Sequence, residues 1–361
     1  MNLQQALSVI DNPTLRDDIA HRLKSAPKPK TKKGRELRNK LAYALQTIPK
    51  SEWGHIQYYD LYSNIAYDLD LGEVETLSGE MTPDGKVKLP DGTLLQHPQQ
   101  FTHKMQAQAE CQPYRGIESY KQWSGIEAEI TFPPADNISY VAGVDQDQYA
   151  NQYGSEAAYN YMTIYNGGIE NADAEAGIFT SAATYFRRGY YYLYTSINGK
   201  PKYFRDFLPD GGQAIQGSDG FKGSRTLWMR FNVAPGLTLT DPGDLRLNVI
   251  DYKTGFQKIY TTSNTPELNA GTLFDLGIDH GMARTTSLLV NSPGGYTKYN
   301  KWMNTKLVDW QNNAHLWTSG YTYLGPYNGD DRAYQCNLNN MTIESTMISP
   351  HYAEEVTVRI N

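Results

Sequence analysis

The chain has 361 residues with a formal net charge of −6, only 20% charged residues, and 28 tyrosines beside 31 glycines. No apolar run approaches the ~18 residues that a membrane-spanning helix needs, so the sequence predicts no membrane span. The acidic balance argues against nucleic acid as the main partner, because phosphate binding needs clustered Lys and Arg.

The first part of the chain differs in charge from the rest. Residues 1–40 hold ten Lys or Arg against four Asp or Glu, whereas the remaining residues hold 23 against 35. This basic segment could dock onto an acidic surface, including that of another copy, or could be a solvated run of charge. It lacks the apolar stretch of a signal peptide, so the protein is intracellular, leaves the cell by another route, or has lost a leader.

Residues 1–50 are expected to form a helical N-terminal arm. Apolar residues recur at helical spacing from Leu3 to Leu23, with a break at Asn12-Pro13, and again from Leu37 to Ile48. A basic linker with two prolines, Ser25 to Gly34, separates the two helical parts. The arm is the only clearly helical part of the chain.

Residues 51–112 are expected to be a β-rich transition segment packed on the main domain. Trp53 to Leu71 alternates well enough for one or two strands. Met81 to Leu95 has the pattern of a hairpin with two Asp-Gly turns, at Asp84-Gly85 and Asp91-Gly92.

Residues 113–361 carry β signals at short intervals, separated by Gly, Pro, Asn or Asp. The expected strands are 125–132, 159–165, 174–181, 190–194, 226–233, 244–252, 256–262, 272–276, 285–290, 316–324, 341–347 and 355–360. Many strands with short connections predict a mainly β chain, specifically a two-sheet antiparallel β-sandwich or jelly roll. No fixed-period repeat is present, which argues against propellers and solenoids.

The order of three segments, Gly125–Phe132, Asp173–Ile178 and Thr184–Tyr191, resembles that of concanavalin-like sandwiches. This superfamily contains lectin-like proteins, glucanases, alginate lyases and glutamic peptidases, and the resemblance covers residues 113–361. Tyr185-Phe186-Arg187-Arg188-Gly189 is similar to a strand of alginate lyases, but their Arg-Thr-Glu-Leu-Arg and Gln-Ile-His patterns and the glucanase pattern Glu-x-Asp-x-x-Glu are missing. The resemblance implies a fold and no particular activity.

Two pairs of carboxylates are the candidate catalytic residues. Glu127 and Glu129 lie two apart on one expected strand, as do Asp173 and Glu175, so each pair should share a face at about 6.5–7 Å spacing. Two carboxylates facing one cleft are the minimal apparatus of a glycosidase. A half-buried strand with its polar side in water would show the same alternation.

One loop has oxygen ligands at the spacing of a calcium-binding loop. The candidates occupy positions 1, 3, 7 and 12 of such a loop: Asp145, Asp147, Asn151 and Glu156. Tyr149 and Ala150 stand where a ligand and the turn glycine belong, so an irregular Ca²⁺ site or a plain polar loop are the alternatives. No other cofactor is indicated.

The two cysteines, Cys111 and Cys336, are too few for a structural zinc site. In an oxidising compartment they could join the two ends of the β domain. Without a signal peptide, free buried thiols are the preferred interpretation.

The densest candidate for ligand binding runs from Trp302 to Asp331. Aromatic faces stack on sugar rings and nearby carboxylates bind ring hydroxyls, which is typical of a carbohydrate site. Any single tryptophan is more often a core residue. The proposed ligand-binding residues are Trp310, His315, Trp317, Tyr321, Tyr323, Tyr327, Asp330 and Asp331.

Three classes of function follow from these patterns. The preferred hypothesis is a non-catalytic, lectin-like protein that binds carbohydrate through an aromatic cluster. The alternatives are a structural or self-assembling protein of a spore, crystal, capsid or surface layer, which associates with its own copies through the basic arm, and a polysaccharide-active enzyme or peptidase.

Overall fold

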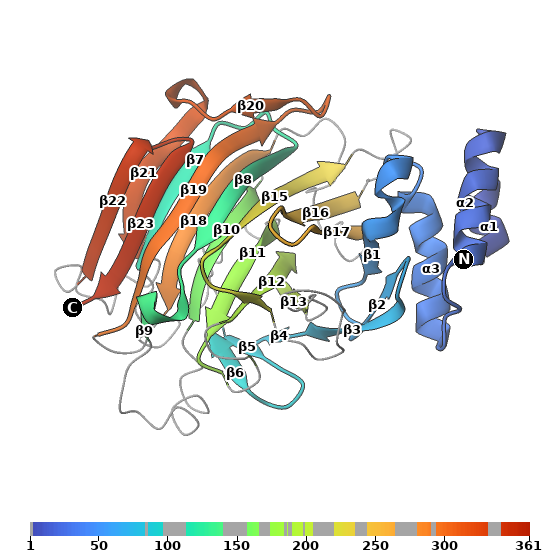
Figure 1. Ribbon diagram of the computed structural model, residues 1–361, viewed down its shortest axis with the longest axis horizontal. Helices are drawn as coiled ribbons and strands as arrows, with labels where there is room; N and C mark the ends of the chain where they lie inside the picture. The colour runs from blue at the N-terminus through green and yellow to red at the C-terminus, as the bar shows by residue number, and fades with distance from the viewer. Residues whose placement is uncertain are drawn as a thin grey trace.

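The computed structural model describes residues 3–83, 86–96, 113–139, 157–165, 174–183, 186, 190–197, 199–204, 220–234, 244–263, 280–289, 294–330 and 341–361. Three helices come first and strands dominate the rest (Figure 1). Within these ranges, none of the helices has the length and apolar character to cross a membrane.

The helical arm contains α1 (Leu3–Ser8), α2 (Pro13–Ser25) and α3 (Lys32–Ala44). Helix α2 begins at the predicted break, because Pro13 needs no hydrogen-bonded N–H there and the Asn12 side chain accepts a 3.1 Å bond from the Leu15 N–H. Thr31 caps α3 in the same way, through a 2.9 Å bond from the Gly34 N–H. Helix α3 therefore begins inside the expected linker, Ser25 to Gly34.

The arm packs on the body of its own chain. Apolar residues of the helices and of the first strands form a separate buried cluster, which includes Ile19, Leu23, Leu37, Leu41, Ile56, Tyr58 and Ile259. Lys33 pairs with Asp60 and Arg22 with Asp70. Part of the acidic surface that the basic arm contacts is thus supplied by the same molecule.

The transition segment contains β1 (Ile56–Tyr59), β2 (Ile65–Asp68), β3 (Gly72–Ser78) and a small sheet of β4 (Glu80–Met81), β5 (Lys86–Lys88) and β6 (Leu94–Gln96). The predicted hairpin is confirmed at its second turn, where the Leu89 N–H bonds the Thr93 carbonyl at 2.8 Å. Gly92 has the positive φ of 92° that this turn requires.

The remaining strands are β7 (Pro113–Ser119), β8 (Gly125–Phe132), β9 (Ile138–Ser139), β10 (Ala157–Tyr165), β11 (Ala174–Ser181), β12 (Tyr190–Ile197), β13 (Lys200–Phe204), β14 (Phe221–Lys222), β15 (Arg225–Ala234), β16 (Asp244–Asp251), β17 (Phe256–Ser263), β18 (Gly281–Leu289), β19 (Tyr296–Val308), β20 (Ala314–Leu316), β21 (Thr322–Asp330), β22 (Met341–Ser349) and β23 (Ala353–Ile360). Most predicted strands are found, and those at 125–132 and 174–181 match residue for residue. The strand expected at 316–324 is divided by a 3₁₀ turn, Ser319–Tyr321. The strands that were not predicted include β7, β13 and β19 and the two-residue strands β9 and β14. Residues 272–276 lie outside the described part.

The strands pair in two runs. The first run is β22-β23-β19-β8-β15-β16-β17-β1-β2-β3, and the second is β21-β7-β18-β10-β11-β12-β13-β3. Strand β3 belongs to both, because residues 72–75 pair with β2 and residues 76–78 pair with β13.

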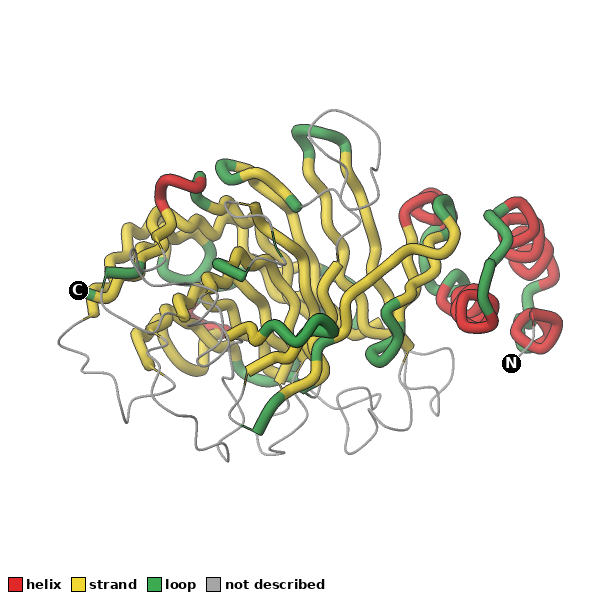
Figure 2. The backbone as a smooth tube through the Cα atoms, turned by 90° about the horizontal axis from the view of Figure 1, so that it is seen from below, coloured by secondary structure: helices red, strands yellow, loops and turns green. Residues whose placement is uncertain are grey.

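In the described part of the chain, the result is one continuous sheet of 20 strands that curls until it is nearly closed (Figure 2). The prediction of a mainly β chain with a helical N-terminal arm is confirmed. The predicted division into two separate sheets is not confirmed, because β3 hydrogen-bonds to both runs.

The main core lies between the two runs. Alternate residues of β8 and β15 point into it, among them Ile126, Ala128, Ile130, Leu227, Met229 and Phe231. The intervening residues of the same strands therefore face outward. This alternation puts Glu127, Trp228 and Arg230 on the outer face of the first run.

Candidate functional site

Two adjoining cavities of about 370 and 250 Å³ lie on the outer face of the first run, over β15, β16 and β17. They share Glu52, Arg230 and Asn248 in their walls and together form what we call the outer groove. The 3₁₀ helix η1 (Lys50–His55) contributes Glu52 to it, and the turn after β19 contributes residues 309–312.

The floor of the outer groove consists of polar side chains from two neighbouring strands. Trp228, Arg230 and Asn232 of β15 share a face and are only partly buried. In the register with β16, Arg230 lies opposite Asn248 and Asn232 lies opposite Arg246. The floor therefore offers amide and guanidinium groups, which hydrogen-bond hydroxyls and other neutral polar groups.

One tryptophan borders each of the two cavities: Trp228 on β15 and Trp310 in the turn after β19. This turn is held by Asp309, whose Oδ1 accepts from the Gln311 and Asn313 N–H groups at 2.9 and 2.8 Å. His315 Nε2 lies 2.8 Å from Asp309 Oδ2. The hydrogen bond from His315, with those from Asn313 and Gln311, lowers the pKa of Asp309 to about 2.

Arg230 is fixed by an ion network with the neighbouring strands β8 and β19. The Glu127 carboxylate is 3% exposed and accepts from Arg230 Nε at 2.7 Å and from Lys306 Nζ at 3.1 Å. Arg230 Nη1 donates to Asn312 Oδ1 at 2.9 Å, and its guanidinium carbon lies 5.7 Å from the Trp228 ring centroid. Both oxygens of Glu127 are engaged with cations, so this residue positions Arg230.

Glu129 shares the outer face with Glu127, as predicted. It lies opposite Trp228 on β15 and Met303 on β19, and its side chain is half-buried. The lining of the outer groove does not include Glu129. The pair is therefore close together, but neither member lines the outer groove.

The predicted aromatic cluster divides into several environments. Trp317 is 0% exposed and its indole N–H donates to Thr322 Oγ1 at 3.0 Å, so it is a core residue and the proposed ligand contact is wrong for it. Tyr321 packs edge-on to Trp123 at 5.0 Å between ring centroids. Tyr323 is 65% exposed and meets Tyr120 at 5.7 Å. Of the predicted residues, Trp310 lines the groove and His315 supports its turn.

Glu175 and Tyr327 lie on one face of the second run, opposite the face whose Arg284 contacts Glu354 of the first run. Glu175 is 6% exposed and belongs to a row of neighbours across four strands: Glu118, Ala283, Thr163 and Glu175. Burial, and in smaller part the charge of Glu175, raises the pKa of Tyr194 well above its usual value. The Tyr327 hydroxyl donates to Glu118 Oε1.

Burial raises the pKa of Glu118, against the opposing effect of the Tyr327 hydrogen bond. Three strand spacings separate Glu118 from Glu175, about 14 Å at the level of the backbone. We call the face of the second run that carries Glu118, Glu175, Tyr194 and Tyr327 the tyrosine face. It unites a predicted catalytic candidate with an acid that was not predicted.

Several predicted residues lie outside the described part of the chain: Asp145, Asp147, Asn151, Glu156, Asp173, Asp331, Cys111 and Cys336. Only the backbone of Asp330 is described. The Ca²⁺ loop and the pairing of the cysteines therefore stay predictions.

Comparison with known proteins places the chain in no family. No protein-family model matches it, and no curated protein matches its sequence.

Three solved structures represent the similarities that were found. A scytalido-glutamic peptidase with a transition state analog inhibitor has 7% identity and a TM-score of 0.38, over 70% of this chain and 100% of its own. The laminarinase catalytic domain from Thermotoga maritima has 9% identity and a TM-score of 0.24, over 85% and 84%. An alginate lyase from Aplysia kurodai has 10% identity and a TM-score of 0.19, over 63% and 86%.

Proposed function

We propose that this chain is a non-catalytic carbohydrate-binding protein and that the outer groove is its binding site. The observation that carries the proposal is the pair Trp228 and Trp310, one beside each cavity of a groove floored by amide and guanidinium side chains. Tryptophan faces stack on the apolar faces of sugar rings, while amides and Arg bind their hydroxyls. The concanavalin-like arrangement, with the two runs packed across one core, is part of the same proposal.

The position of the carboxylates also favours binding over catalysis in this groove. Neither Glu127, which is held by two cations, nor Glu129 is part of the lining. Two other carboxyls do line the groove, Glu52 and Asp309. Both oxygens of Asp309 are already engaged within its own turn, which leaves Glu52 without a second free carboxyl beside it in the described lining. Glycosidases need two carboxyls that both reach the scissile bond. The arrangement of Trp228, Arg230 and Trp310 can hold a glycan without supplying that pair.

The test is tryptophan fluorescence quenching on titration with a panel of neutral oligosaccharides. We expect saturable quenching by at least one glycan, and a loss of affinity of about tenfold in Trp228→Ala and in Trp310→Ala, since stacking contributes about 1–3 kcal/mol in comparable contacts. Tyr252→Ala is the matched control, because Tyr252 is 68% exposed and lines neither cavity. No response to any glycan, or equal affinity in all three variants, would sink the proposal.

An enzyme is the second candidate, favoured by the tyrosine face. Glu118 has a raised pKa and accepts from a tyrosine hydroxyl, and the buried Glu175 lies in the same row across the sheet. A carboxyl whose pKa is raised toward neutrality is suited to general acid catalysis. Assays on polysaccharides and peptides should then show turnover that falls at least a hundredfold in Glu175→Gln and in Glu118→Gln, roughly the contribution of a general acid or base. Turnover that is unchanged in both variants would reject this role.

Self-assembly through the basic arm stays a prediction. Its test is the particle size of the full chain beside that of a chain lacking residues 1–40. Large particles that dissociate without the arm would support it, and a monomer in both cases would contradict it.

A further inference from the structure

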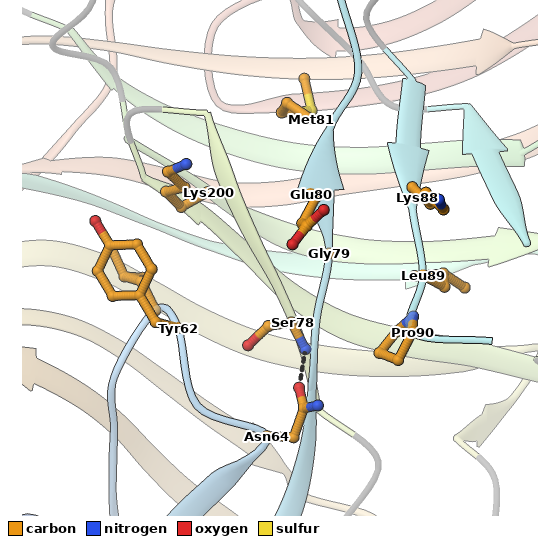
Figure 3. A pocket seen from close by; sticks show the side chains of 11 residues that line it. Tyr62, Asn64, Ser78, Gly79, Glu80, Met81, Lys88, Leu89, Pro90 and Lys200 are labelled. Atoms are coloured by element: carbon orange, nitrogen blue, oxygen red, sulfur yellow. Dashed lines mark hydrogen bonds between the residues drawn. The ribbon is translucent and has the colours of Figure 1, made fainter. Parts of the chain in front are cut away.

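A cavity of about 580 Å³ lies away from the outer groove, where β3 and β13 meet the small sheet of β4, β5 and β6. We call it the seam pocket (Figure 3). Tyr62 and Lys200 lie on one side of it, Lys88, Leu89 and Pro90 on the other, and Glu80 between them. Its lining shares no residue with that of the groove.

Two lysines from different strands give this pocket its charge. Lys88 ends β5 and Lys200 begins β13, and both side chains are exposed. Lys200 Nζ lies 5.9 Å from the centroid of the Tyr62 ring, a ring that is itself 58% exposed. An acidic group that enters the pocket can be bound by ammonium groups, next to an exposed aromatic ring.

Glu80 separates an acidic sugar from a simple anion as the ligand. Its carboxylate repels any anion, but it also accepts hydrogen bonds from hydroxyls, which a sugar supplies and an inorganic anion does not. Asn64 and Ser78 add further polar groups at the base of the pocket, where Asn64 Oδ1 accepts from the Ser78 N–H at 2.9 Å. The lining therefore suits a ligand that carries one acidic group and several hydroxyls on a ring.

The base of the pocket is firmly held. Lys202, 0% exposed, donates to Ser78 Oγ at 2.8 Å and to the Ser63 carbonyl. Asp60 Oδ1 accepts from the Ser63 and Tyr62 N–H groups at 2.7 and 2.9 Å, which fixes the turn that presents the Tyr62 ring. A preorganised site loses less conformational entropy on binding.

We propose that the seam pocket binds an acidic sugar, a carbohydrate unit with a carboxylate or a sulfate, at a site independent of the outer groove. The acidic group is held by Lys88 and Lys200, the ring lies against Tyr62, and its hydroxyls donate to Glu80 and Asn64. The proposal deepens the carbohydrate-binding function but uses none of the groove residues.

The experiment is calorimetric titration of the full chain with three oligosaccharides of equal length: an oligoglucuronate, a sulfated gluco-oligosaccharide and the neutral gluco-oligosaccharide. At least one acidic probe should bind, and a comparison of the two shows whether the pocket accepts a carboxylate or a sulfate. Lys88→Met and Lys200→Met should each weaken that binding about tenfold, the usual effect of losing one charge-assisted hydrogen bond. Lys200→Arg should retain most of it.

Two controls separate this site from the groove and from general charge. Lys253→Met removes an exposed lysine of the β16–β17 turn and should bind like the wild type. Trp310→Ala should leave binding of the acidic probe unchanged, so that a failed groove and a failed seam pocket give different results. Equal affinity for acidic and neutral probes, or Lys88→Met and Lys200→Met variants that behave like Lys253→Met, would overturn the proposal.

Discussion

Arg284 of β18 and Glu354 of β23 form an ion pair of 3.0 Å between the two runs, with both side chains 1% exposed. Arg115 of β7 approaches the other oxygen of Glu354 at 2.7 Å, so one carboxylate serves two guanidinium groups. Ser345 of β22 donates to the same carboxylate. This cluster joins the two runs at the end of the molecule that lies opposite the helical arm (Figure 1).

Removing the charge of Glu354 should strongly destabilise the fold. In Glu354→Gln two buried guanidinium groups lose their shared counter-ion, and breaking a buried pair in this way costs about 3–5 kcal/mol. Urea unfolding measures the change in the free energy of unfolding. Glu355→Gln is the control: it breaks the partly exposed 3.0 Å pair with Lys301 and should cost less than about 1 kcal/mol. Similar losses in the two variants would contradict the structure.

The Glu354 carboxylate should also make the free energy of unfolding depend on pH in the acidic range. Burial raises the pKa of Glu354. The charges of Arg284 and Arg115 and the Ser345 hydrogen bond lower it by more than burial raises it, so the folded pKa lies below the usual value. A lowered folded pKa means that the stabilisation is fully present above the unfolded-state pKa of about 4.3 and is lost as the pH falls through the folded pKa. The stability difference between wild type and Glu354→Gln should therefore shrink below about pH 4, as followed by urea unfolding at successive pH values. A constant difference across this range would argue against it.

Lys202 should give the opposite kind of pH dependence. Burial lowers the pKa of Lys202 to about 7, against the charge of Asp60. The unfolded chain then binds more protons than the folded chain between about pH 7 and 10, so stability should rise with pH in this window by up to about 1.4 kcal/mol per unit. Lys202→Met should remove that slope, whatever its effect on the absolute free energy of unfolding. A slope that persists in the variant would show that another group causes it.

Asp309 should control the groove by fixing the turn that carries Trp310. In Asp309→Ala the bonds to Gln311, Asn313 and His315 are lost, so we expect glycan affinity to fall about fivefold to tenfold with little change in melting temperature. Asp91→Ala removes a comparable turn aspartate, which accepts from the Thr93 N–H at 2.9 Å and lies outside the groove. The two variants should differ in binding and not in stability.

Much of the fold could be predicted from the sequence, and β19 shows where this failed. It is the longest strand and lies between β8 and β23, yet its residues do not alternate regularly. Tyr299 and Asn304 adopt positive φ values of 63° and 52°, and the pairing register shifts near each of them. Each irregularity changes which residues face the core, so the period of two that identifies a strand is lost.

The candidate site was less predictable because distant segments build it. Trp310 could be selected from the aromatic cluster, but the sequence does not separate it from Trp317, which turns into the core seven residues later. Trp228 and Arg230 carry one usable signal, the outward positions of an alternating strand. That Glu52 faces them depends on the pairing of β1 with β17, which local sequence does not show.

The dual pairing of β3 has a consequence for how the chain can be divided. Residues 113–361 would be the natural unit to produce if the sequence boundaries marked independent domains. Without β1 to β3, however, the pairing edges of β17 and β13 would face solvent, and exposed edges of this kind recruit other chains. We therefore expect a chain that begins at residue 113 to aggregate more readily than the full chain.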